Sequence, residues 1–127
     1  MTKRNIYKYL FFAWLFLIII AASISQLPTP RIKTSSGSSI RFDYYIHILE
    51  FLILSILFFL WLANRNPQQI KKNFVIVFAI SIVLAFIIEF YQNFVPGRKF
   101  NILDSIFNLI GLLIGIAIVA ISKWTKK

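Results

Sequence analysis

Residues 73–97 read NFVIVFAISIVLAFIIEFYQNFVPG and contain a single charged residue, Glu89. A helix needs roughly 20 apolar residues to cross the hydrocarbon core of a bilayer, so this stretch is long enough to span a membrane. Its apolar residues run continuously, whereas the strands of a membrane β-barrel alternate apolar and polar residues. The stretch therefore predicts a transmembrane α-helix that ends near the Pro96-Gly97 turn.

Three further stretches have the same apolar character. Residues 9–30 and 105–122 carry no charge, and residues 44–64 carry only Glu50. We predict helices at residues 7–25, 43–63, 73–94 and 102–122. The first has the basic start and small residues of a signal peptide, but its apolar run is longer than a signal peptide needs, so we expect it to be retained. Residues 1–127 then form one all-α integral membrane domain with four transmembrane helices.

The composition excludes several other classes of protein. Hydrophobic residues make up 59% of the chain and charged residues 14%, against about 45–50% and about 25% in soluble globular domains. The absence of cysteine excludes a disulfide framework, a zinc ribbon and a thiol nucleophile. The net charge of +10 does not indicate nucleic acid, because the basic residues form short clusters between apolar runs. We expect membrane lipids, and no nucleic acid, as partners.

The basic residues are divided unevenly between the two sides of the predicted bundle. Nine lie on the side that holds both termini and the loop between the second and third helices, and five lie on the other side. The positive-inside rule places the richer side, and so both termini, in the cytoplasm. The first outer loop, residues 26–42, combines two prolines with a serine-rich run, and we expect it to be flexible.

All four carboxylates and the only histidine lie towards the outer side of this arrangement. Asp43, His47 and Glu50 are spaced i, i+4 and i+7, so they share one face of the second helix. Glu50 lies about 10 Å deeper than Asp43 at the rise of an α-helix. An ionisable residue inside a membrane span is costly and usually has a functional or pairing role. The second helix therefore predicts part of a polar site.

The third and fourth helices bring polar residues to the same level. Glu89 and Gln92 lie three residues apart near the outer end of the third helix, and Arg98 follows in the short loop above them. The fourth helix has one face that is polar near the outer side and glycine below it, where another helix can approach closely. The residues of that face are Asp104, Asn108, Gly111 and Gly115.

Each of these polar residues also has a purely structural explanation. His47 would hydrogen-bond a neighbouring helix, Glu50 would form an ion pair with a loop arginine, and Asp104 would cap the fourth helix or sit in its first turn. Glu89 would lie close enough to the interface to be solvated. None of these explanations accounts for the location of all the carboxylates towards one side.

The segment from Glu89 to Arg98 has the pattern E-x-x-Q-x-F-x-P-G-R, and Asp104 begins a D-x-x-x-N-x-x-G-x-x-x-G pattern. With the H-x-x-E-aromatic element that starts at His47, these motifs resemble the VanZ-like family. Many members carry a basic residue where this chain has Tyr44, and Asp43 matches an acidic residue of some members. The resemblance implies a small protein of the bacterial inner membrane, connected with the cell envelope or with glycopeptide tolerance. It implies no settled reaction.

The first functional hypothesis is an outward-facing site that binds or acts on a lipid-linked or glycopeptide-type ligand of the envelope. Arg98 would hold a phosphate or carboxylate with its planar guanidinium group. Glu89, His47 and Glu50 would be the catalytic acid and base groups. Carboxylate oxygens would also suit a divalent cation. The other ligand-binding residues would be Gln92, Asp104, Asn108 and Asp43.

Two other hypotheses compete with a ligand site. The polar residues would form a non-catalytic plug that fixes helix register in an accessory module, alone or as a homo-oligomer. Alternatively, the protein would be a small proton-coupled transporter, although the inner halves of the last three helices carry no ionisable residue for a relay. The sequence leaves open whether the protein is an enzyme.

Overall fold

The computed structural model describes residues 3–24, 31–33, 39–65 and 67–124. Four long helices dominate this part of the chain: α1 (Lys3–Ser23), α2 (Asp43–Arg65), α3 (Ile70–Tyr91) and α4 (Ile102–Trp124). Two single-turn 3-10 helices flank α3, η1 (Pro67–Gln69) and η2 (Gln92–Phe94). All four long helices are apolar enough to cross a membrane, which confirms the predicted all-α fold with four transmembrane helices.

The helix bounds differ most from the prediction at the start of α1 and at both ends of α3. α1 begins at Lys3 rather than at residue 7, and α3 begins at Ile70 rather than at residue 73 and ends at Tyr91 rather than at residue 94, where η2 follows it. In both helices the additional turn contains basic residues that precede the apolar run. Backbone hydrogen bonds continue a helix whether or not its side chains are apolar, so the apolar pattern alone marks the span rather than the helix end.

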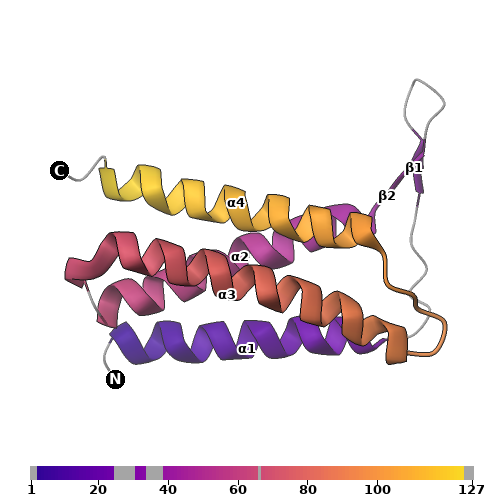
Figure 1. The fold of residues 1–127 in the computed structure, drawn as a ribbon, viewed down its shortest axis with the longest axis horizontal. Helices are drawn as coiled ribbons and strands as arrows, with labels where there is room; N and C mark the ends of the chain where they lie inside the picture. The colour runs from indigo at the N-terminus through magenta and orange to yellow at the C-terminus, as the bar shows by residue number, and fades with distance from the viewer. Residues whose placement is uncertain (1–2, 25–30, 34–38, 66, 125–127) are drawn as a thin grey trace.

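Helix α2 is central to the bundle. It contacts the other three helices and packs most extensively against α4. Figure 1 shows the start of α1 and the end of α4 at the same end of the bundle, as four successive spans require. The first turns of α2 and α4 lie at the opposite end, together with the last turns of α1 and α3. We call this second end the hairpin end.

A short β-hairpin at the hairpin end was not predicted. Strand β1 (Arg31–Lys33) pairs antiparallel with β2 (Ser39–Arg41), and Ile32 stands opposite Ile40. The two triplets, Arg-Ile-Lys and Ser-Ile-Arg, each place a β-branched residue between polar ones, which suits a strand. Residues 25–30 and 34–38 of the loop expected to be flexible lie outside the described part of the chain.

The bundle interior is mainly apolar and aromatic. Phe51, Phe59 and Leu112 are completely buried, and Phe59 packs on Phe74 with ring centroids 4.4 Å apart. Many other large apolar side chains are exposed along the outer surface of the helices, which suits contact with lipid. Because lipid tails are as apolar as this core, close packing and polar contacts must hold the helices together.

Close contact between α2 and α4 depends on two glycines. A Cβ atom added at Gly111 would lie 2.9 Å from the Cα atom of Ile48, and one at Gly115 would lie 2.7 Å from the backbone oxygen of Leu52. Both distances are too short for carbon in a packed interior. Glycine therefore sets the separation of the two helices that carry most of the polar residues.

We expect Gly111→Ala to destabilise the protein, because the new methyl group must push α4 away from the backbone of α2. Overpacking of this kind typically costs about 1–3 kcal/mol. Thermal denaturation in detergent should show a lower Tm than the parent. The matched control is Ala117→Leu, which enlarges an exposed side chain of the same helix. An equal Tm for parent and Gly111→Ala would contradict the close approach.

Candidate functional site

His47 is the centre of the polar cluster. It lies in the second turn of α2 and is 9% exposed. Its ring reaches polar groups from all three of α2, α3 and α4. The spacing from Asp43 turns both residues to the same side of α2. One imidazole therefore connects the polar faces that the sequence placed on separate helices.

The Nδ1 atom of His47 faces the bundle interior. It lies 3.1 Å from the Oδ1 atom of Asn108, at hydrogen-bonding distance. Two carboxylate oxygens are further away, Oε2 of Glu50 at 3.8 Å and Oε1 of Glu89 at 3.9 Å. The hydrogen bond to α4 is thus the closest polar contact on this side of the ring.

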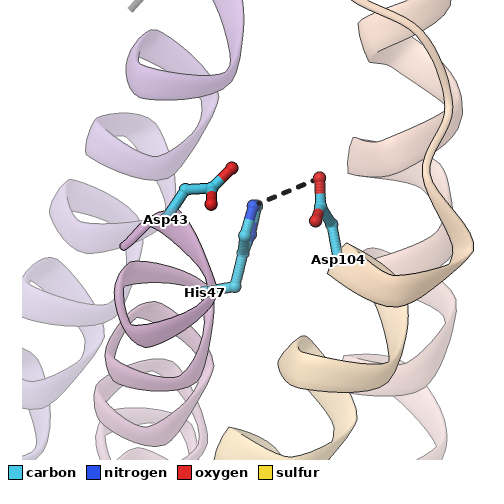
Figure 2. A group of neighbouring side chains, drawn as sticks. All are labelled: Asp43, His47 and Asp104. Carbon is cyan, nitrogen blue, oxygen red and sulfur yellow. Dashed lines mark ion pairs between the residues drawn. The ribbon is translucent and has the colours of Figure 1, made fainter. Parts of the chain in front are cut away.

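The Nε2 atom of His47 faces two aspartates. Asp104 Oδ2 lies 3.7 Å from Nε2, and Figure 2 shows Asp43 reaching toward the same ring from the start of α2. Asp43, His47 and Asp104 each offer a ligand atom, and the three atoms lie within 4.8 Å of one another. In the described part of the chain this is the group that could hold a metal ion.

Glu89 occupies a different environment from the other carboxylates. Its side chain is completely buried near the end of α3, and neither carboxyl oxygen has a hydrogen bond within the described residues. The positive charge of Arg98 attracts it from a longer distance. The structural alternative in which Glu89 is solvated at the interface is therefore wrong, because its side chain is buried in the bundle.

Arg41 lines the pocket and balances the negative charge of Asp43. Its guanidinium group donates two hydrogen bonds to the carboxylate of Asp43, one of them from Nε at 3.1 Å, and its terminal nitrogen lies 4.0 Å from Asp104. Partial burial alone would lower the pKa of Arg41, but the hydrogen bond and charge of Asp43 outweigh it, so the pKa is raised. Arg41 therefore remains a cation beside the two aspartates.

Asn101 fixes the orientation of Asp104. Its Oδ1 accepts a hydrogen bond from the backbone N–H of Leu103 at 3.1 Å, which is an N-cap contact for α4. Its Nδ2 donates to Asp104 Oδ1 at 2.8 Å. Asp104 thus lies in the first turn of α4 and Asn101 is the capping residue, so only the first-turn alternative of the sequence analysis is correct.

A pocket of about 870 Å³ opens at the hairpin end above His47. Of the predicted site residues, Glu89 and Asn108 do not line it; they lie behind the histidine ring, in the bundle. The pocket wall combines the other polar site residues with apolar side chains from α1 and α3. The predicted residues that line it are Asp43, His47, Glu50, Gln92, Arg98 and Asp104.

The turn after α3 places Arg98 at the pocket. Gly97 has a φ of 80°, a backbone conformation that glycine adopts without steric cost. The backbone N–H of Arg98 then donates to the carbonyl oxygen of Val95 at 3.1 Å. The Pro-Gly-Arg sequence therefore reverses the chain and presents a guanidinium group to the pocket.

Sequence reasoning missed several contributors to this site. Arg41 and Lys99 also line the pocket, but the sequence suggested Arg41 only as a structural ion-pair partner of Glu50 and Lys99 only as a loop charge. Asn101 carries a recognisable signal, since an Asn three residues before an acidic residue at the start of an apolar run is typical of a helix N-terminus. Trp14 donates its indole N–H to the backbone oxygen of Glu50 at 2.9 Å, and a tryptophan inside an apolar span gave no such indication.

We expect Asn101→Ala to lower stability by about 1 kcal/mol, because α4 loses its N-cap. Asn101→Ser is the matched control. A serine hydroxyl can accept the N-cap hydrogen bond, but it is too short to donate to Asp104 as the amide does. Chemical denaturation in detergent should place the serine variant close to the parent and the alanine variant below it. If the alanine variant is as stable as the parent, Asn101 is not the cap.

The motifs and the fold agree with a comparison against families of known proteins. The model of the family described as VanZ/LLP1 matches residues 2–123 of the 127-residue chain. No curated protein and no solved structure matches the chain. The family match covers all four helices and the polar cluster between them. This multi-pass membrane protein therefore belongs to the VanZ/LLP1 family.

Proposed function

We propose that the pocket binds the anionic headgroup of a lipid-linked ligand of the cell envelope, at the outer face of the bacterial inner membrane. The observation that supports this best is the mixed lining of the pocket. Ionisable side chains of α2 and α4 form one part of the wall, and Ile18, Ala22 and Ile88 form an apolar part. Such a wall suits a molecule with a charged group and a hydrocarbon chain.

The positive side chains of the pocket favour an anion. Arg41 already forms an ion pair with Asp43. Within the described residues, the guanidinium group of Arg98 forms no such ion pair with a side chain. A guanidinium group forms paired hydrogen bonds with a phosphate or carboxylate. Lys99 adds a second positive charge beside it. Arg98 is therefore the residue on which headgroup binding should depend most.

If the bound ligand is also chemically changed, the proton-transfer groups are His47 and Glu50. Both line the pocket, and general acid–base catalysis needs hydrogen-bond reach to the reacting atom. Glu89 was assigned a catalytic role from the sequence, but its position behind the ring favours an indirect role through His47. Tolerance of glycopeptide antibiotics would then follow from an altered envelope ligand.

A non-catalytic structural role is the second candidate, and one observation favours it. Glu89 and Asn108 are completely buried and join α3 and α4 to His47 on α2. Polar groups buried in this way can fix helix register. Proton transport is the weakest of the three, because residues 51–64, 73–88 and 105–122 contain no ionisable group that would continue a path to the opposite side.

We expect the protein in phosphatidylcholine nanodiscs to bind a polyprenyl phosphate more tightly than the corresponding polyprenol. Arg98→Gln should weaken binding of the phosphate by about tenfold or more, because hydrogen bonds to charged groups contribute about 1.5–3 kcal/mol. Native mass spectrometry of the nanodiscs would measure occupancy. The parent Tm should be retained.

Lys72→Gln is the matched control, since Lys72 is exposed at the other end of α3. Equal binding of phosphate and polyprenol would show that the pocket does not recognise the headgroup. A lower Tm of Arg98→Gln, with unchanged binding of the phosphate by the folded protein, would favour the structural role instead.

A further inference from the structure

We propose that Asp43, His47 and Asp104 form a binding site for a divalent cation of the manganese or zinc type. Two carboxylates and one imidazole converge from α2 and α4, and their ligand atoms lie within 4.8 Å of one another. Figure 2 shows the histidine ring between the two aspartates. All three residues line the pocket. The inference adds a metal to the proposed ligand pocket, but metal binding itself does not depend on that ligand.

The hydrogen bond of His47 prepares the ring for a metal. Asn108 Oδ1 can only accept a hydrogen bond, so the Nδ1 atom 3.1 Å away is the donor. In the neutral ring the lone pair then lies on Nε2, which faces Asp104 Oδ2 at 3.7 Å. A lone pair and a carboxylate repel each other unless a proton or a metal ion lies between them, and 3.7 Å is longer than an N–H···O hydrogen bond. Metal-binding histidines almost always donate their other ring N–H in this way.

Both aspartates are held by partners that leave ligand positions open. Asn101 donates to Oδ1 of Asp104, and Oδ2 of the same carboxylate faces His47. Arg41 donates to both oxygens of Asp43, but each carboxylate oxygen has a second lone pair. Ligating carboxylates are commonly hydrogen-bonded by neighbouring side chains. These contacts therefore hold both carboxylates in place and leave lone pairs free for a metal ion.

The donor set determines the class of ion. One imidazole and two carboxylates suit borderline and hard divalent ions, with bonds of about 2.0–2.2 Å. The side chains must approach one another by roughly 1 Å to reach such bonds, a change that rotation about side-chain bonds supplies. Three protein ligands leave further positions free for water or a ligand, as in catalytic sites. An anionic headgroup in the pocket could take one of them.

The test is titration of the protein in phosphatidylcholine nanodiscs with Mn²⁺, with free Mn²⁺ measured by its electron paramagnetic resonance signal. We expect one bound ion per chain, and binding at least tenfold weaker in His47→Ala and Asp104→Asn. Glu50→Gln is the matched control, because it removes a carboxylate that lies 3.8 Å from Nδ1, on the other side of the ring. If Glu50→Gln weakens Mn²⁺ binding as much as the other two variants do, Mn²⁺ is attracted by the overall negative charge, and the proposed site is overturned.

A second measurement uses the unchanged protein, so it does not depend on the folding of any variant. Pulsed electron paramagnetic resonance of the Mn²⁺-loaded protein should show coupling to one directly bound imidazole nitrogen. Absence of nitrogen coupling would overturn the proposal. Neither measurement contains an anionic lipid, so failure of the metal site and failure of headgroup binding give different results.

Asn108 is a positioning residue in this proposal. Asn108→Ala should weaken Mn²⁺ binding by about 10–100-fold, as loss of a partner of a ligating histidine typically does. Asn108→Asp keeps an oxygen acceptor for Nδ1–H and should restore most of the affinity. If the alanine and aspartate variants bind Mn²⁺ equally, the hydrogen bond to His47 does not prepare the site.

Discussion

Five ionisable side chains of the helices have to share one small region of an apolar bundle, and this constraint shapes the rest of the structure. A charge in a low-dielectric interior is costly unless it is paired, hydrogen-bonded or hydrated. The four carboxyl groups and His47 therefore turn towards one another at the hairpin end. Arg41 and Arg98 approach from the connections to balance them. The opposite halves of the helices then contain no carboxylate and no histidine.

His47 divides this region into two parts with different properties. Its Nδ1 side faces two completely buried groups that join the helices, Asn108 and Glu89, and also Glu50, which lines the pocket. Its Nε2 side faces Asp43 and Asp104, which line the pocket. A change on the buried side should therefore act first on stability and ring orientation. A change on the pocket side should act first on binding.

The fold was largely predictable because each span is a long, nearly uncharged run. The meeting of Asp43, His47 and Glu50 was also predictable, since helical spacing places residues four and seven apart on one face. The distinction between Glu50 in the pocket and Glu89 behind it was not. That distinction depends on how α3 rotates against α2 and α4, and a one-helix pattern does not contain this information. The β1–β2 hairpin was missed because two three-residue strands give little signal.

Binding of an envelope ligand requires the pocket to open to the outside of the cell, an orientation that only the distribution of basic residues predicts. The chain has no cysteine, so single cysteines can report exposure on each side. Lys99→Cys marks the pocket and Lys71→Cys marks the other end of α3. With a membrane-impermeant maleimide on intact cells, we expect labelling of the first variant only, and of the second after permeabilisation. Labelling of Lys71→Cys but not Lys99→Cys in intact cells would contradict the account.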